Sequence, residues 1–162
     1  MRGLPGGEKS DKTPGMTNRT DLPSTTRSLP IAMLRARETI MAPIRQMLNK
    51  AGVTEQQWRV LRVLDERGTT DPKDLAQAAC LLNPSLTRIM QLLEKKGLIE
   101  RKDHPSDRRK VLLDITAEGR ALLARAAPES AAIFTRLEER FGREEMDRLL
   151  DLLNALSAVE LE

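Results

Sequence analysis

Aromatic side chains are almost absent from this sequence. Trp and Phe make up 2% of its 162 residues, and there is no tyrosine. Sites for single-stranded nucleic acid stack bases on exposed rings, so this class of site is disfavoured. The chain also has only one histidine, His104, and no Ser-His-Asp, metal-ligand or phosphate-loop arrangement. We therefore expect neither an enzyme nor a cofactor or metal site, and we expect His104 to be a loop contact or simply exposed.

Cysteine and long apolar segments are equally scarce. A single cysteine, Cys80, excludes an intramolecular disulfide and is typical of a reducing compartment. No apolar run approaches the roughly 18 residues that suggest a membrane span, and the N-terminus lacks the apolar core of a secretory signal. With 40% hydrophobic and 31% charged residues, the chain can bury one domain-sized core. These features predict a cytoplasmic protein with no membrane partner.

The first 27 residues differ in composition from the rest of the chain. They are rich in Gly, Pro, Ser, Thr and charged residues, which predicts a disordered tail over residues 1–27. Met16 lies inside this tail and is an alternative start of translation. A basic arm that touches DNA is the functional alternative, although five basic and three acidic residues give the tail a net charge of only +2.

The stretch from Asn83 to Thr116 predicts a helix followed by two strands. Asn83 can cap the helix, Pro84 suits its first position, and Gly97 can end it in the left-handed conformation. Leu86, Ile89, Met90 and Leu93 recur at helical spacing, which predicts that they form one buried stripe of this helix. Its opposite face carries Ser85, Thr87, Arg88, Gln91 and Lys95. The helix therefore has one apolar side for a core and one polar side for a partner.

Beyond Gly97 the apolar residues alternate, as in a two-stranded hairpin. The alternating residues are Val111, Leu113 and Ile115, interleaved with Lys110, Leu112 and Asp114. The hairpin loop, residues 103–109, ends in the basic run Arg108, Arg109 and Lys110, and the whole stretch 83–116 has a net charge of +3. Like charges crowded at a hairpin tip need a negative partner. A polar helix face beside a basic hairpin predicts a winged helix-turn-helix that reads double-stranded DNA.

Further helices are predicted on both sides of this stretch. Helical spacing and caps place them at residues 28–50, 55–68, 73–80, 116–141 and 143–159. Pro43 and Pro128 fall inside two of them and predict a bend or a break. The first helix and the last two have more apolar faces than a small winged-helix domain can cover, so we expect a second copy of the chain to cover them.

The segment PSLTRIMQLLEKKGLIERKDHPSDRRKVLLDIT resembles the MarR family of bacterial winged-helix transcriptional regulators. Two further segments, SLPIAMLRARETIMAPIR and TEQQWRVLRVL, are similar to the homoprotocatechuate-degradation repressor branch of that family. The resemblance implies a mainly α fold whose N- and C-terminal helices interlock in a homodimer. It divides the MarR-type domain, residues 28–162, into a DNA-binding lobe at 53–116 and dimerisation helices at 28–52 and 117–162.

The candidate DNA contacts lie on the polar helix face and in the loop. Arg88 can meet a guanine edge or a phosphate, Gln91 can reach adenine, and Ser85 and Thr87 can bind phosphates, although a solvated face explains the same pattern. In the loop, Asp107 and Arg109 could be a surface ion pair of small worth. The resemblance implies instead that Asp107 orients Arg109 into a minor groove, beside Arg108.

An effector site is implied by the resemblance alone. A small aromatic carboxylate would bind between the DNA-binding and dimerisation regions, and a carboxylate needs an arginine. The candidates are Arg35, Arg37, Trp58 and Arg59. Trp58 could equally be core packing, and Arg35 or Arg37 could form interface ion pairs.

Cys80 offers an alternative mode of regulation, because some MarR relatives sense peroxide through a thiol. A sensing thiol must be accessible and have a lowered pKa. Cys80 follows an Ala-rich helix and precedes Leu81 and Leu82, so we expect it in the core.

Our leading hypothesis is a homodimeric repressor on a pseudo-palindromic operator, released by a phenolic acid.

Overall fold

The computed structural model describes residues 24–104, 106–107 and 110–160. The chain divides into two units, residues 1–35 and 36–162, which are described separately. In the first unit, the backbone N–H of Arg27 donates to the carbonyl of Ser24 (2.7 Å), and this turn precedes the start of helix α1, Leu29–Ala51. Of the expected tail, residues 1–23 lie outside the described residues.

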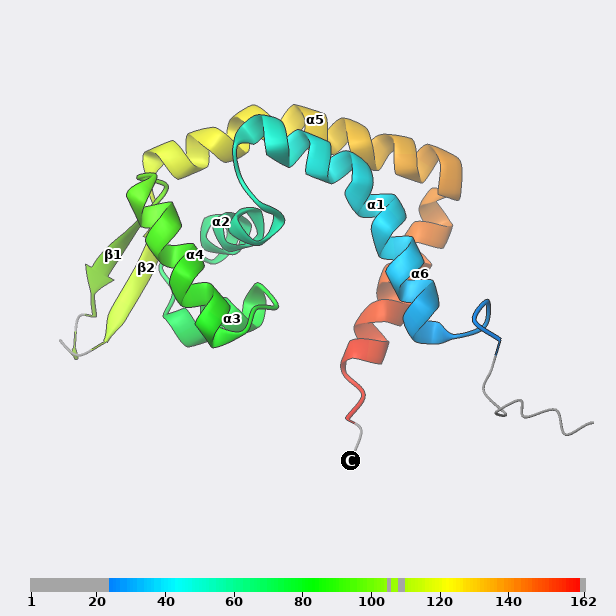
Figure 1. Cartoon of the computed structure of the whole chain (residues 1–162), viewed down its shortest axis with the longest axis horizontal. Helices are drawn as coiled ribbons and strands as arrows, with labels where there is room; N and C mark the ends of the chain where they lie inside the picture. Colours follow the sequence, from blue (N-terminus) through cyan, green and yellow to red (C-terminus); the bar gives the residue numbers. More distant parts are fainter. Residues whose placement is uncertain (1–23, 105, 108–109, 161–162) are drawn as a thin grey trace, which may run out of the picture. The chain divides into compact units, whose positions relative to one another are not determined.

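The second unit contains the rest of α1 and all the other elements. The helices are α2 (Glu55–Arg67), α3 (Pro72–Ala78), α4 (Asn83–Lys95), α5 (Ala117–Phe141) and α6 (Arg143–Ser157). The strands β1 (Ile99–Asp103) and β2 (Val111–Ile115) form an antiparallel hairpin in which Ile99 pairs with Ile115 and Asp103 with Val111. Figure 1 shows the hairpin beside α4 at the start of α5, and α6 beyond the end of α5. The predicted mainly α, winged-helix fold is confirmed.

The helix ends follow local chemistry that the sequence shows. Thr54 and Gln57 form a capping box at the start of α2, in which the Gln57 N–H donates to Thr54 Oγ1 and the Thr54 N–H donates to Gln57 Oε1, both at 3.2 Å. Asp71 Oδ1 accepts the N–H groups of Lys73 and Asp74 at the start of α3. Gly97, with φ +69°, ends α4 as predicted.

One cap was predicted at the wrong residue. Asn83 is the first residue of α4, and the extended residue before it is Leu82, which makes no side-chain capping bond. Pro84 therefore occupies the second helical position. An Asn-Pro pair fits either register at a helix start, so the sequence could not separate the two.

The core of the second unit is formed by apolar side chains from α1 to α5 and both strands. Leu48 from α1, Leu61 from α2, Leu75 from α3, Leu93 from α4 and Leu113 from β2 are all at most 1% exposed. All four residues of the predicted α4 stripe are buried. This packing fixes α4 with its polar face outward.

Neither internal proline breaks its helix. α1 continues through Pro43 and α5 continues through Pro128, so the predicted break at Pro128 is wrong, and a bend at either site stays a prediction. Both helices exceed 20 residues, and packing along such a length compensates for one lost backbone hydrogen bond. No helix of the described residues is long and apolar enough to cross a membrane.

Cys80 is exposed, and its predicted place in the core is wrong. It has a φ of +51° and follows the end of α3, where its N–H donates to the Gln77 carbonyl (3.1 Å) and the Leu81 N–H donates to the Ala76 carbonyl (2.8 Å). This bonding pattern is a Schellman motif, whose left-handed position is usually glycine. Because no glycine marks this end, the sequence suggested a longer, buried helix.

Candidate nucleic-acid interface

The outer face of α4 carries exposed polar side chains, with one exposed apolar side chain, Leu92, among them. The five predicted contact residues on it are Ser85, Thr87, Arg88, Gln91 and Lys95. The hydroxyl of Thr87 donates to the carbonyl of Asn83 (3.3 Å). The structure thus brings these five residues together on one helix face, as their spacing predicts, and their contact with DNA stays a prediction.

The hairpin next to α4 is held to it by an ion pair. Arg101 on β1 binds Glu94 on α4 through Nε and Nη2, at 2.5 and 3.0 Å, and this hydrogen bonding raises the pKa of Arg101. Bidentate geometry of this kind fixes direction as well as distance. The hairpin and α4 therefore form one connected surface.

The loop residues are described only in part. Arg108 and Arg109 lie outside the described residues. Asp107 is half-buried, and its carbonyl accepts the N–H of Lys110 (2.9 Å). The ring Nδ1 of His104 accepts the N–H of Ser106 (3.3 Å), so His104 makes a contact within the loop. The orientation of Arg109 by Asp107 stays a prediction.

Asp114 is a further candidate functional residue, which the sequence did not single out. It lies in β2, is 8% exposed and accepts hydrogen bonds from Lys102 Nζ (2.5 Å), Thr69 Oγ1 (3.0 Å) and the Ile115 N–H (2.8 Å). The hydrogen bond from Lys102 is the main reason that the pKa of Asp114 lies below its ordinary value, against the opposing effect of burial. The alternating pattern of this strand predicts no partner for the Asp114 carboxylate, and only its spacing from Lys102 in the hairpin could have indicated one.

The four effector candidates differ in their surroundings. Arg37 pairs with Glu55 at the start of α2, and this bond raises the pKa of Arg37. Trp58 is half-buried and packs against the core, as its core alternative predicted. Arg35 belongs to the first unit and is exposed. Arg59 is half-buried, and its Nε is a buried nitrogen with no hydrogen-bond partner among the described residues.

The end of α4 is hydrogen-bonded to the start of α2, the helix that carries Trp58 and Arg59. Lys96 Nζ donates to the carbonyl of Gly52 (2.7 Å), which follows α1, and lies 3.5 Å from Oε1 of Gln57 on α2. Gln57 is buried and belongs to the capping box that begins α2. The end of α4 is thus connected to the first turn of α2, where Glu55 holds Arg37.

A short helix, a turn, a helix with an exposed polar face and a following hairpin together define a winged helix-turn-helix DNA-binding protein. Residues 53–111 match the MarR family. The HTH-type transcriptional regulator FarR of Neisseria gonorrhoeae is 44% identical over 133 residues, which cover 82% of this chain and 91% of that relative. The homoprotocatechuate degradative operon repressor of Escherichia coli is 40% identical over 132 residues, 82% of this chain and 89% of the relative.

Among solved structures, NadR in complex with 4-hydroxyphenylacetate superposes with a TM-score of 0.76 at 43% identity, covering 87% of this chain and all of that one. The chain belongs to the MarR family. Members of this family are transcriptional regulators and not enzymes, so the resemblance is confirmed and this chain is identified as a transcriptional regulator.

Proposed function

We propose that this chain is a cytoplasmic homodimeric repressor of aromatic-acid catabolism genes, released from a pseudo-palindromic operator by a small phenolic acid. The observation that carries the proposal is the polar face of α4 beside the hairpin, in a chain 40% identical to a homoprotocatechuate degradative operon repressor. In this proposal, residues 53–116 bind DNA, and residues 28–52 and 117–162 dimerise.

DNA contact follows from the geometry of the helix and the hairpin. An α-helix fits the major groove, so Arg88 and Gln91 would meet base edges while Ser85, Thr87 and Lys95 bind phosphates. The loop with Asp107, Arg108 and Arg109 would then lie over the adjacent minor groove. Two copies related by a twofold axis would read half-sites about 10 to 10.5 base pairs apart.

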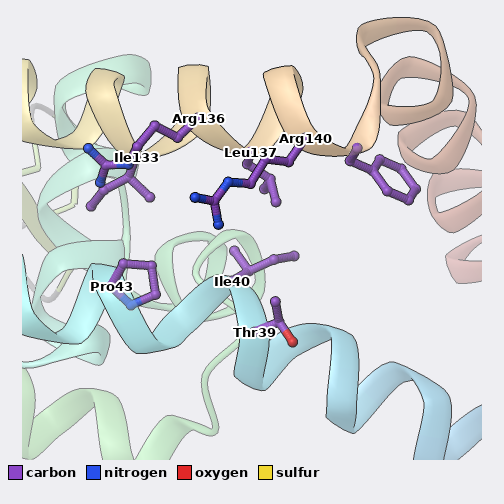
Figure 2. A pocket seen from close by; sticks show the side chains of 8 residues that line it. Thr39, Ile40, Pro43, Ile133, Arg136, Leu137 and Arg140 are labelled. Carbon is purple, nitrogen blue, oxygen red and sulfur yellow. The ribbon is translucent and has the colours of Figure 1, made fainter.

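The dimer is supported by apolar surface that the second unit leaves uncovered. No residue of α6 is buried, although the helix carries five leucines and a methionine over Arg143–Ser157. Figure 2 shows a groove between α1 and α5 in which Ile133 and Leu137 face Ile40 and Pro43, and its volume is about 450 Å³. Exposed apolar surface on a helix is typical of a protein interface. Because the chain belongs to the MarR family, a second copy of the chain is the partner that we propose for this surface.

The effector proposal concerns a carboxylate and the arginines of α1 and α2. Arg59 Nε is a donor without a partner in the part of the chain that the structure describes, and buried polar groups in proteins are normally bonded, so an incoming carboxylate would satisfy it. Arg37 is held by Glu55, so a carboxylate could reach it only by competing with that side chain. Disturbing Glu55 would act on the first turn of α2 and, through Gln57 and Lys96, on the end of α4.

Release from DNA requires that the effector bind one arrangement of the two DNA-binding lobes of the dimer better than the other. An effector with equal affinity for both arrangements would not shift the equilibrium between them. The bonds from Lys96 to Gly52 and Gln57 offer a direct connection between the effector candidates and α4.

The test is fluorescence anisotropy of the purified protein with DNA from its own upstream region against scrambled DNA, at fixed salt, with and without 4-hydroxyphenylacetate. We expect specific binding that the acid weakens. Arg59→Ala should keep operator binding and lose the response, whereas Arg67→Ala, at the end of the same helix, should keep both. Specific binding that ignores the acid in the wild type would exclude this effector, and no preference over scrambled DNA, with flanking regions also tried, would overturn the function.

A redox-responsive regulator is the second candidate, because Cys80 is exposed near the start of α4. Oxidation there would alter the turn that leads into the recognition helix. The variant Cys80→Ser separates the two candidates. A variant whose DNA release still responds fully to peroxide would remove this alternative.

A further inference from the structure

Asp114 is surrounded by donors from several parts of the second unit. Its Oδ2 accepts from Lys102 Nζ on β1 and from Thr69 Oγ1, at 2.5 and 3.0 Å. Its Oδ1 accepts from the N–H of Ile115 (2.8 Å) and lies 3.5 Å from Nη2 of Arg120 on α5. One carboxylate on β2 therefore contacts the partner strand, the segment after α2 and the first turn of α5.

These contacts lie where the hairpin leaves the helices. Thr70 and Leu113 form a single bridge of two hydrogen bonds, each 2.9 Å, immediately beside Asp114. Arg120 also approaches Asp65 on α2, with Nε 3.8 Å from Oδ1. The carboxylate thus joins both strands to α2 and α5 at the base of the hairpin.

The site requires a charge as well as a hydrogen-bond acceptor. Asp114 faces Glu100 directly across the hairpin, and like charges in that position are unfavourable. Lys102 lies within reach of both carboxylates, with Nζ 3.3 Å from Glu100 and 2.5 Å from Asp114. A carboxylate that is 8% exposed would be costly without such cationic partners.

We propose that Asp114 is a positioning residue for the DNA-contacting hairpin. By holding Lys102, Thr69 and Arg120 together, it fixes the direction in which the hairpin leaves α2 and α5, and with it the ability to distinguish the operator from other DNA. This inference rests on the proposed function, because it requires the hairpin loop to meet DNA.

The substitution Asp114→Asn isolates the charge. An asparagine has nearly the same size and can still accept from the Ile115 N–H, but it loses the ionic contacts with Lys102 and Arg120. Removing one negative charge and releasing Lys102 should leave binding to random DNA equal or stronger. A hairpin with a less defined direction should weaken operator binding.

Glu100→Gln is the matched control. It removes the same charge from the same hairpin and takes away one partner of Lys102, but Glu100 is exposed and its ion pair is with Lys102 of its own strand. We expect this variant to change operator and random-DNA affinity by the same factor.

The experiment measures operator and scrambled-DNA affinities of the wild type and both variants at several salt concentrations, with thermal unfolding as a check on folding. In Asp114→Asn we expect the ratio of operator to random affinity to fall by about tenfold, roughly the worth of one specific base contact. In Glu100→Gln we expect an unchanged ratio.

Equal ratios in all three proteins, or an equal fall in both variants, would overturn the inference while leaving the proposed function standing. A wild type without operator preference would overturn the proposed function itself. Should Asp114→Asn fail to fold, Arg120→Gln removes one contact from an exposed side chain, and a folded Arg120→Gln protein with the wild-type ratio would equally count against the proposal.

Discussion

Single residues on α4 divide into those that hold the helix and those that are available to a ligand. Leu86 and Leu93 are at most 2% exposed, whereas Arg88 and Gln91 are exposed between them. A substitution on the outer face can therefore change DNA binding with little effect on the fold. This separation makes the contact residues testable one at a time.

Arg88→Ala and Arg109→Ala should weaken operator binding in different ways. Loss of a bidentate base contact by Arg88 should lower operator affinity about 5- to 150-fold and relax specificity at one position. Loss of Arg109 from the minor groove should weaken operator binding, and it should reduce the salt slope by about one if that arginine contacts the phosphate backbone. Anisotropy titrations across salt concentrations measure both quantities, with Arg67→Ala as the control.

Unchanged affinity and salt slope in Arg109→Ala would refute the assignment of the loop arginine. For Arg88, a variant that binds every sequence equally less well would make it a phosphate contact instead of a base contact. The two outcomes are independent.

For single residues, the sequence predicts which side chains are buried better than it predicts unusual backbone conformations or distant hydrogen-bond partners. Periodicity correctly predicted which α4 side chains are buried, because burial on a helix follows its 3.6-residue repeat. It failed at Cys80, where a non-glycine residue adopts a positive φ, and it missed Asp114, whose partners Lys102 and Thr69 lie 12 and 45 residues away in the chain. Both depend on tertiary contacts or on backbone geometry that residue type does not specify.

At the scale of elements, the contact between α5 and the hairpin is unusually close. A Cβ atom at Gly119 would lie 2.3 Å from the Leu98 carbonyl oxygen and 2.6 Å from Cγ1 of Ile115. Thr116, which caps α5, also donates its hydroxyl to the Gly97 carbonyl (2.7 Å). The start of α5 thus packs directly on the junction between α4 and β1.

Gly119→Ala should destabilise the protein by about 1–3 kcal/mol, because overpacking against backbone outweighs the better helix propensity of alanine. Urea unfolding followed by circular dichroism measures the difference. Ala124→Gly, at an exposed position of the same helix, is the control and should cost about 1 kcal/mol through propensity alone. A Gly119→Ala protein as stable as the wild type would show that α5 can shift away from the hairpin at little cost.

Most element boundaries were predictable because their signals are local. The capping box at Thr54, the cap at Asp71 and the glycine at 97 all act within a few residues of a helix end. Pro128 was misjudged because its effect depends on the packing of a 25-residue helix. Local chemistry determines where these helices begin and end, and tertiary packing determines whether an internal defect is tolerated.

At the scale of the whole molecule, the uncovered faces of α5 and α6 are the main expectation left to test. Phe134 and Phe141 on α5 are 44% and 49% exposed, and Leu150 on α6 is 51% exposed. The excess of apolar faces was visible in the sequence. The same excess predicted a second copy of the chain as the partner, and the family resemblance implied the same.

Leu153→Asp should shift the protein from dimer to monomer at micromolar concentration, because a carboxylate in an apolar interface is costly. Operator affinity should fall with it, since two half-sites would no longer be bound together. Sedimentation velocity measures the first effect and anisotropy the second. Asn154→Asp adds the same charge at the neighbouring helical position and should remain dimeric, and a dimeric Leu153→Asp protein would exclude this face as the interface.

The left-handed turn that ends α3 also has a practical consequence. Cys80 is the single cysteine of the chain and is exposed just before α4 begins at Asn83. A maleimide dye would therefore attach at one defined position without any engineered substitution. In a dimer the two dyes would report the separation of the two recognition helices by energy transfer, so the native protein carries its own attachment point for observing how an effector moves its DNA-binding heads.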